Sequence, residues 1–549
     1  MTDRIGDART GEIQGVLEAA PGGPAGAEPP RSGRTAPAWL WIAGLLVLVP
    51  IGVPVLAMLA RVLGASDSAW ETLFDSRTIE LVLRSALLTV LVTASATAVG
   101  IAAAWITVRT NLGMRRLWGT LLVLPLVIPS YVFALAFLAA SGPRGLVADI
   151  TGIEVPFLDG LPGAWLALTL STFPYVYLVT AAAMQRLDPS LEEAGRGLGA
   201  SPWRVFRTIT LPLLRPAVGA GALLAALYTL SDFGAVSLMR FDAFTRVIYA
   251  QYSGRLDRTP AAVLSIVLIV IALVILWAEQ RTRGRSAHFS SRPARRAPLH
   301  QLTARGRAAA VAFLATVAAL GVAIPVAVLV AWVARGIAAG ETVTVAWNAV
   351  AGSIVGSGLA AALAVAAAIP VVLLAVRHRS RTTDALERSV YVTFSLPHIT
   401  VALAVLIFAV RYLGPLYQSL ALLVVVYAAM FLAQATGAAK ASLLQVNPHL
   451  EEAARGLGKG PFRTLRDVTI PLIWRGLLAG GALVFLTTMK ELPATLLLRP
   501  TGFETLAVRI WAAADELFYA RAAAAALVLL AVSAVPAYVL VVRPKEATP

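Results

Sequence analysis

Twelve apolar segments, each long enough to cross a lipid bilayer as a helix, constrain the fold of this 549-residue chain more than any other feature. Charged residues make up only 14% of the chain, against about one quarter in soluble proteins, and the mean hydropathy is +0.77. We therefore expect an all-α polytopic membrane protein with about 12 transmembrane helices. They form two series of six, at about 39–62, 82–108, 117–140, 161–185, 212–238 and 260–279, then 308–334, 347–376, 389–410, 416–439, 471–498 and 519–542.

Basic residues are concentrated in alternate connections between these segments. With the N-terminus placed in the cytoplasm, the cytoplasmic connections hold 32 of the 46 lysines and arginines. This bias follows the positive-inside rule and predicts a multi-pass protein of the inner (plasma) membrane with both termini in the cytoplasm. It also accounts for the net charge of +16 without nucleic acid as a partner; the partner is the lipid bilayer.

The composition of two polar regions predicts the domain boundaries. Residues 1–37 are rich in Pro, Gly, Ala and Arg, and predict a disordered cytoplasmic tail. Residues 281–307 hold eight arginines and no acidic residue, and predict a basic cytoplasmic linker. The expected transmembrane domains are then 38–280 and 308–549.

The two domains are copies of one another. The stretch "EEAGRGLGASPWRVFRTITLPLLRP" at 192–216 recurs as "EEAARGLGKGPFRTLRDVTIPLIWR" at 451–475, with 13 of 25 positions identical. An even number of spans in each copy gives both the same orientation. We therefore expect a pseudo-two-fold axis along the membrane normal, unlike the inverted repeats of many secondary transporters.

Each repeated stretch is a polar island between the fourth and fifth spans of its half. In the first copy, Asp188 is a good helix N-cap, Pro189 suits the first helical position and Gly199 offers a helix stop. This pattern predicts a short helix, a glycine turn and a second short helix. The corresponding residues of the second copy are Asn447, Pro448 and Gly458.

Both islands resemble the "EAA" signature of ABC importer permeases, in the order Glu-Ala, Gly, Leu-Pro. The first copy departs from it by Gly195, and the second by Val468 and Ile470. In that family the loop forms a coupling helix that sits in a cleft of a cytoplasmic ATPase. The resemblance thus implies two cytoplasmic ABC ATPase subunits and an extracytoplasmic solute-binding protein as partners. The residues that it assigns to ATPase coupling are Glu192, Glu193, Ala194, Gly199, Glu451, Glu452, Ala453 and Gly458.

Fused two-domain chains of this length resemble the ferric-iron importers, and also thiamine and some phosphonate systems. The segments at 227–252 and 489–511 look like the fifth helix and following loop of the iron branch. The resemblance therefore implies a permease for ferric iron, with thiamine or a phosphonate as alternatives.

The chain carries little chemistry of its own. It has no G-x-x-x-x-G-K-[ST] loop, so we expect ATP to be used by a partner subunit, with no cofactor on this chain. There is no cysteine, and five scattered histidines predict no metal cluster. We predict no catalytic residue.

Three ionisable residues near the outer ends of the fifth spans are candidates for a translocation path, because burying charge in a membrane is costly. They are Asp232 in the first half, and Lys490 and Glu491 in the second. The alternative is a structural ion pair, with Lys490 and Glu491 neutralising each other, or a residue that snorkels to the membrane interface. For the whole chain, two other classes of protein are alternatives. An ion-coupled secondary transporter would have no ATPase for the duplicated islands to contact. A membrane receptor or scaffold would need a larger extramembrane domain.

Overall fold

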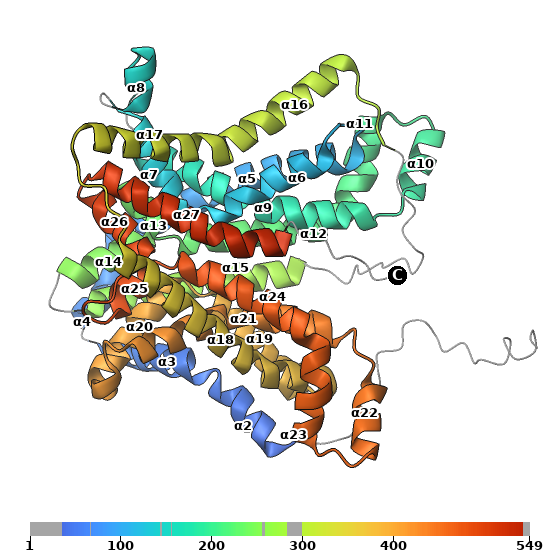
Figure 1. Ribbon diagram of the computed structural model, residues 1–549, viewed down its shortest axis with the longest axis vertical. Coiled ribbons are helices and arrows are strands. Elements are labelled where there is room, and N and C mark those ends of the chain that lie inside the picture. Colours follow the sequence, from blue (N-terminus) through green and yellow to red (C-terminus); the bar gives the residue numbers. More distant parts are fainter. Residues whose placement is uncertain are drawn as a thin grey trace, which may run out of the picture.

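The computed structural model describes residues 36–65, 67–142, 145–154, 156, 158–254, 258–282 and 299–541, and is helical almost throughout this part of the chain (Figure 1). The predicted tail and most of the predicted linker lie outside the described residues. The helices of the first half are α2 (Ala38–Leu46), α3 (Val49–Leu63), α4 (Asp67–Phe74), α5 (Ser76–Arg109), α6 (Arg115–Val123), η1 (Leu124–Val127), α7 (Ser130–Ala140), α8 (Leu146–Thr151), α9 (Gly160–Arg186), α10 (Ser190–Gly197), α11 (Pro202–Val205), η2 (Phe206–Thr210), α12 (Leu211–Ser231), α13 (Gly234–Leu238), α14 (Phe244–Gly254) and α15 (Thr259–Thr282).

The second half repeats this order. Its helices are α16 (Ala304–Ala318), η3 (Ala319–Ala323), α17 (Ile324–Ala338), α18 (Trp347–Arg377), α19 (Arg381–Ser395), α20 (His398–Tyr412), η4 (Gly414–Leu416), α21 (Leu420–Leu443), α22 (Pro448–Gly456), α23 (Pro461–Thr464), η5 (Leu465–Thr469), α24 (Ile470–Met489), α25 (Pro493–Leu498), α26 (Leu506–Asp515) and α27 (Tyr519–Val541).

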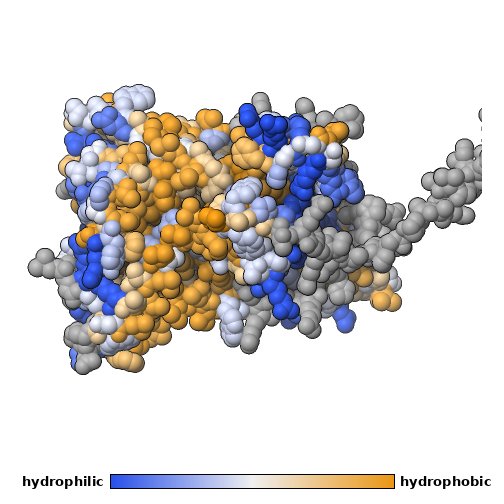
Figure 2. All heavy atoms as spheres, turned by 90° about the horizontal axis from the view of Figure 1, so that it is seen from below, coloured by the Kyte–Doolittle hydropathy of each residue, from blue (hydrophilic) through white to orange (hydrophobic). Residues whose placement is uncertain are grey.

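The described residues form nine helices that are long and apolar enough to cross a membrane, or up to twelve when each of three bent pairs is taken as one span. A band of apolar side chains runs across the molecule between two hydrophilic ends (Figure 2). The twelve predicted spans therefore correspond to these nine helices and three bent pairs.

The third span of each half is broken rather than continuous, which corrects the predicted runs 117–140 and 389–410. The two helices of the span meet at 93° in the first half and at 101° in the second. The breaks fall at Pro129 and Pro397, which lack an N–H and push the preceding residues, Ile128 and Leu396, into extended conformation. The helices that follow, α7 and α20, are buried over most of their length.

The fifth spans are also shorter than the predicted runs 212–238 and 471–498. Helix α12 ends at Ser231 and α24 ends at Met489, and a separate short helix, α13 or α25, follows each. The interruptions place Asp232 and Glu491 at helix ends, where their side chains reach backbone N–H groups.

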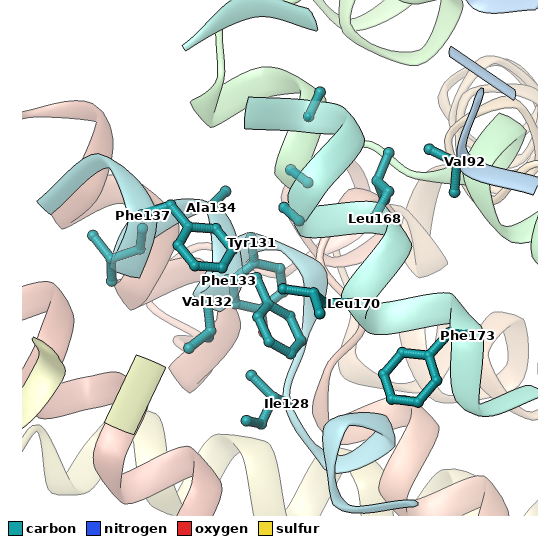
Figure 3. Packing of buried hydrophobic residues seen from close by; sticks show 14 of the residues in the cluster. Val92, Ile128, Tyr131, Val132, Phe133, Ala134, Phe137, Leu168, Leu170 and Phe173 are labelled. Atoms are coloured by element: carbon teal, nitrogen blue, oxygen red, sulfur yellow. The ribbon is translucent and has the colours of Figure 1, made fainter. Parts of the chain in front are cut away.

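The two halves exchange their first spans. Helix α3 of the first half packs on α20 of the second, and α17 of the second half packs on α7 of the first. Both large apolar clusters consequently contain side chains of both halves. Figure 3 shows part of one cluster, with Ile128, Tyr131 and Phe133 on one side and Leu168, Leu170 and Phe173 on the other.

Candidate functional site

The two polar islands form the same structure at the same end of the molecule, where α10 and α22 lie on one side (Figure 1). The side chain of Asp188 accepts a hydrogen bond of 3.0 Å from the N–H of Ser190. At the equivalent place, Asn447 accepts one of 3.0 Å from the N–H of His449. The second copy therefore has the predicted start, whereas α10 begins one residue later than predicted, at Ser190, with Asp188 still bonded to its first N–H.

Each helix ends two residues before the predicted glycine, which forms the turn that follows. Gly199 has φ +81° and Gly458 has φ +86°, a left-handed conformation that glycine adopts without the steric cost that a Cβ adds. The next residue closes the turn: the N–H of Ala200 donates to Gly195 O, and that of Lys459 to Ala454 O, each at 3.1 Å.

The first glutamate of each island is an anchor against the membrane part of its own half; Glu451 is buried and Glu192 is largely buried. Glu451 forms two hydrogen bonds with Arg377 at the end of α18, at 3.1 and 3.2 Å. Glu192 forms an ion pair of 3.2 Å with Arg109 at the end of α5. A charged pair of this kind ties the short helix to the second span of its half.

A threonine completes each anchor. Thr210 donates to Glu192 at 3.0 Å and Thr469 donates to Glu451 at 3.1 Å. Both threonines end a π-helical turn, η2 or η5, that leads into the fifth span. The short helix is therefore connected to the second and fifth spans at once.

The other predicted coupling residues lie on the opposite, solvent-facing side. Glu193 and Ala194 are exposed, as are Glu452 and Ala453. The structure thus divides the eight candidates into buried anchors and an exposed face.

Two exposed apolar pairs next to the glycines were missed by the sequence reasoning. Leu198 is 89% exposed and Trp203 is 69% exposed; at the equivalent places Leu457 is 86% and Phe462 is 69% exposed. A large apolar side chain held in water beside a rigid turn is typical of an interaction surface. The sequence does contain a sign of this surface, because a leucine and an aromatic residue occupy equivalent positions in both islands.

The second island has an ion pair at its turn that the first lacks. Lys459 Nζ lies 2.8 Å from Asp467 Oδ2, and the corresponding residues of the first island are Ala200 and Thr208. The second turn is therefore tied to its π-helical segment by a charge pair that the first island cannot form.

The two carboxylates proposed for the path occupy equivalent positions. Asp232 Oδ1 accepts from the N–H of Ala235 at 2.9 Å, and Glu491 Oε1 accepts from the N–H of Ala494 at 3.1 Å. Each carboxylate is buried and caps a short helix. The second oxygen of each contacts the first residue of the helix that follows the break within the third span.

The partner differs between the halves. Ser130 at the start of α7 donates to Asp232, whereas His398 at the start of α20 lies with Nδ1 2.8 Å from Glu491 Oε2. These two residues follow the equivalent prolines Pro129 and Pro397. The broken third spans thus place matching polar groups against matching carboxylates.

Lys490 has no counterpart in the first half, where Ser231 stands at its position. Its Nζ donates to the carbonyl oxygen of Leu126, in the opposite half, at 2.7 Å. Among the described residues no ion pair joins it to Glu491, so the predicted structural pair between these two neighbours is wrong. Lys490 is instead a charged contact across the interface between the halves.

A cavity of about 190 Å³ brings these groups together between the halves. Asp232, Lys490 and Glu491 all line it, with His398 and Ser130. Its further polar lining residues are Tyr131, Tyr175, Tyr228, Ser231, Ser395, Gln434 and Thr487. Within the described residues, no group of three or more His, Cys, Asp or Glu side chains has an arrangement that would hold a metal ion.

Two tandem helical domains, anchored loops at one end and a polar cavity between the halves define a membrane transport protein. The chain matches the model of the family "Binding-protein-dependent transport system inner membrane component" over residues 96–281 and 372–543, and it belongs to this family. One match falls in each half, as the internal repeat requires.

Three relatives illustrate the family. The chain is 33% identical over 513 residues to the Fe(3+)-transport system permease protein FbpB 2 of Haemophilus influenzae, covering 92% of this chain and 98% of the relative. The molybdenum transport system permease protein ModB of Escherichia coli is 35% identical over 34% of this chain and 87% of its own length. A probable sulfate transport system permease protein, cysT of Chlorokybus atmophyticus, is 27% identical over 44% of this chain and 86% of its own length.

This protein is accordingly a multi-pass permease of a binding-protein-dependent ABC importer. The two other classes considered from the sequence, an ion-coupled secondary transporter and a receptor or scaffold, are set aside by family membership.

Proposed function

We propose that this permease imports ferric iron, and that ATP hydrolysis by two cytoplasmic ATPase subunits drives the import. The observation that carries the iron assignment is the similarity to the Fe(3+) permease along 98% of that relative's length. The molybdenum and sulfate relatives each cover less than half of this chain. Of these three relatives, the iron permease is therefore the one that matches both domains of this chain.

The anchored islands are the proposed attachment points of the ATPases. Each ATPase contacts the exposed face of one island, with Glu193 on α10 and Leu198 directly after it, or Glu452 on α22 and Leu457 directly after it. Because Glu192 and Glu451 bind the second and fifth spans, movement of a coupling helix is passed to both, and the fifth spans line the cavity. Closure of the ATPase dimer would then reorient the two halves about the cavity.

The orientation follows from this role. The islands face the cytoplasm, and both termini lie on the same side. The opposite ends of the halves receive the solute from an extracytoplasmic binding protein. The cavity lined by Asp232, Lys490 and Glu491 is the proposed passage between these sides.

Uptake of radiolabelled ferric iron and radiolabelled thiamine in a strain that lacks this permease tests the substrate. Expression of the chain with its ATPase and binding protein should restore iron uptake and leave thiamine uptake unchanged. Restored thiamine uptake without iron uptake would assign the chain to the alternative substrate.

A second experiment tests the coupling face. The double variant Glu193→Lys and Glu452→Lys should lose ATPase association and iron uptake while its membrane insertion stays normal, because both side chains are exposed. Unchanged uptake would refute this assignment of the coupling residues.

A further inference from the structure

The described end of the linker is bound to the end of α5, next to the anchor of the first island. The N–H of His300 donates to the carbonyl oxygen of Arg109 at 2.8 Å, and the carbonyl oxygen of His300 accepts from the N–H of Asn111 at 3.1 Å. The side chain of Asn111 also accepts a hydrogen bond of 3.0 Å from the N–H of Leu302. These bonds hold the linker beside Arg109, which forms the ion pair with Glu192.

The ring of His300 packs at one end of a row of aromatic side chains. Its centre lies 5.8 Å from that of Trp105, and Trp105 meets Phe206 of η2 edge-on at 6.4 Å. Phe206 in turn stacks on Trp203 at 5.6 Å, and Trp203 is 69% exposed in the first island. These separations are those of aromatic rings in contact. The row therefore connects the linker with the surface that is proposed to contact an ATPase.

The equivalent place in the second half shows what fills this site. In the first half, the space between the anchor and the π-helical turn has a volume of only about 20 Å³, and His300, Trp105 and Phe206 are among the residues that line it. In the second half, Leu373 and Leu465 stand at the positions of the two aromatic residues, and the cavity has a volume of about 490 Å³. Within the described ranges, no backbone bridge like that of His300 forms at the end of α18.

The bound linker segment leads directly into the first span of the second half. Only three residues separate His300 from Ala304, the first residue of α16. Thr303 caps this helix by accepting a hydrogen bond of 3.1 Å from the N–H of Gly306. The span continues through η3 into α17, which packs on α7 of the first half. The first island is therefore held by the second and fifth spans of its own half and, through the linker, by the first span of the other half.

We infer that His300 is a positioning residue for coupling: packed on Trp105, it fixes the first island relative to the first span of the second half. Movement of α10 by an ATPase then displaces α16 as well as α5 and α12. The effect on transport rests on the proposed attachment of the ATPases to the islands. The effect on the island itself belongs to the permease alone and is measured separately.

Hydrogen exchange of the permease without its partners tests the contact. His300→Ala removes the ring but leaves the backbone bonds, and should accelerate exchange of the amides of η2 and α10 roughly two- to tenfold, the effect of losing one aromatic contact. The amides of α22 are the internal control and should exchange at the wild-type rate, because His300 does not line the cavity of the second half. His300→Phe keeps a ring against Trp105 and should retain slow exchange. Unchanged exchange in His300→Ala, or equal acceleration in α10 and α22, overturns the inference.

Transport in proteoliposomes that contain the permease and its ATPase, supplied with the binding protein, ATP and radiolabelled iron, tests the coupling. The measured quantity is the amount of iron transported per ATP hydrolysed. His300→Ala should lower this ratio about twofold or more, and His300→Phe should keep it near the wild-type value. Loss of folded protein alone lowers both rates and leaves the ratio unchanged, so an unchanged ratio in His300→Ala overturns the positioning role. A wild-type protein that transports no iron refutes the proposed import, while the exchange rates still decide whether His300 holds the island.

Discussion

Removal of the buried carboxylate of Glu451 should release α22 from the membrane domain. This side chain accepts two hydrogen bonds from Arg377, at 3.1 and 3.2 Å, and a third from Thr469 at 3.1 Å. Its side chain is only 5% exposed and that of Arg377 only 14%. Breaking a buried ion pair by removing one partner costs about 3–5 kcal/mol. We expect about 3 kcal/mol for Glu451→Ala, because the arginine that remains can reach some water.

Hydrogen exchange of the backbone amides in α22 measures this loss directly. A decrease of about 3 kcal/mol in the free energy of local opening accelerates exchange about a hundredfold. Glu452→Ala is the matched control: it removes the adjacent but exposed carboxylate and should change the rate little, since exposed ion pairs contribute about 0–1 kcal/mol.

The double variant of Glu451→Ala with Arg377→Ala separates the pair from the individual groups. In this variant no arginine is left unpaired. The amides of α22 should therefore exchange more slowly than expected from adding the free-energy losses of the two single variants. Exchange in α22 that is equally slow in Glu451→Ala and in the wild-type protein would refute the role of this pair as an anchor.

Three further predictions concern other sites. Gly221→Ala should reduce the free energy of unfolding by about 1–3 kcal/mol and lower the thermal midpoint, because the added Cβ would lie 2.7 Å from the backbone of α9. Gly219→Ala is the control: its Cβ meets open space, so the midpoint should not fall. Gly458→Ala should cost about 1 kcal/mol in the same melting assay, since alanine must adopt φ +86° there; an unchanged midpoint would count against the strained turn. The pair Leu198→Ser and Leu457→Ser should abolish co-purification of the ATPase without altering the midpoint, because both leucines are almost fully exposed; retained co-purification would remove these residues from the contact.

Local features of the islands could be predicted because they depend on neighbouring residues. The caps at Asp188 and Asn447 and the stops at Gly199 and Gly458 follow from side-chain and backbone preferences within one helical turn, and the structure contains all four. The burial of Glu451 could not be predicted in this way. Its partner Arg377 lies 74 residues away, at the end of another span.

The broken third spans show where hydrophobicity alone is insufficient. Length and hydropathy are nearly the same for a straight span and for two helices that meet at about a right angle. The prolines at 129 and 397 mark the break, but a proline in a membrane helix produces anything from a slight bend to a full interruption. The packing of α7 and α20 inside the molecule decides which of these occurs.

The sequence by itself determined the class of fold, the duplication, the number of spans and the structure of the coupling loops. Each of these depends on composition, on periodicity or on contacts within a few residues. Tertiary structure decided that the halves exchange their first spans, that Lys490 reaches Leu126 and that Asp232 and Glu491 share a cavity. These features join residues far apart along the chain, and they arise because each half buries part of its apolar surface against the other.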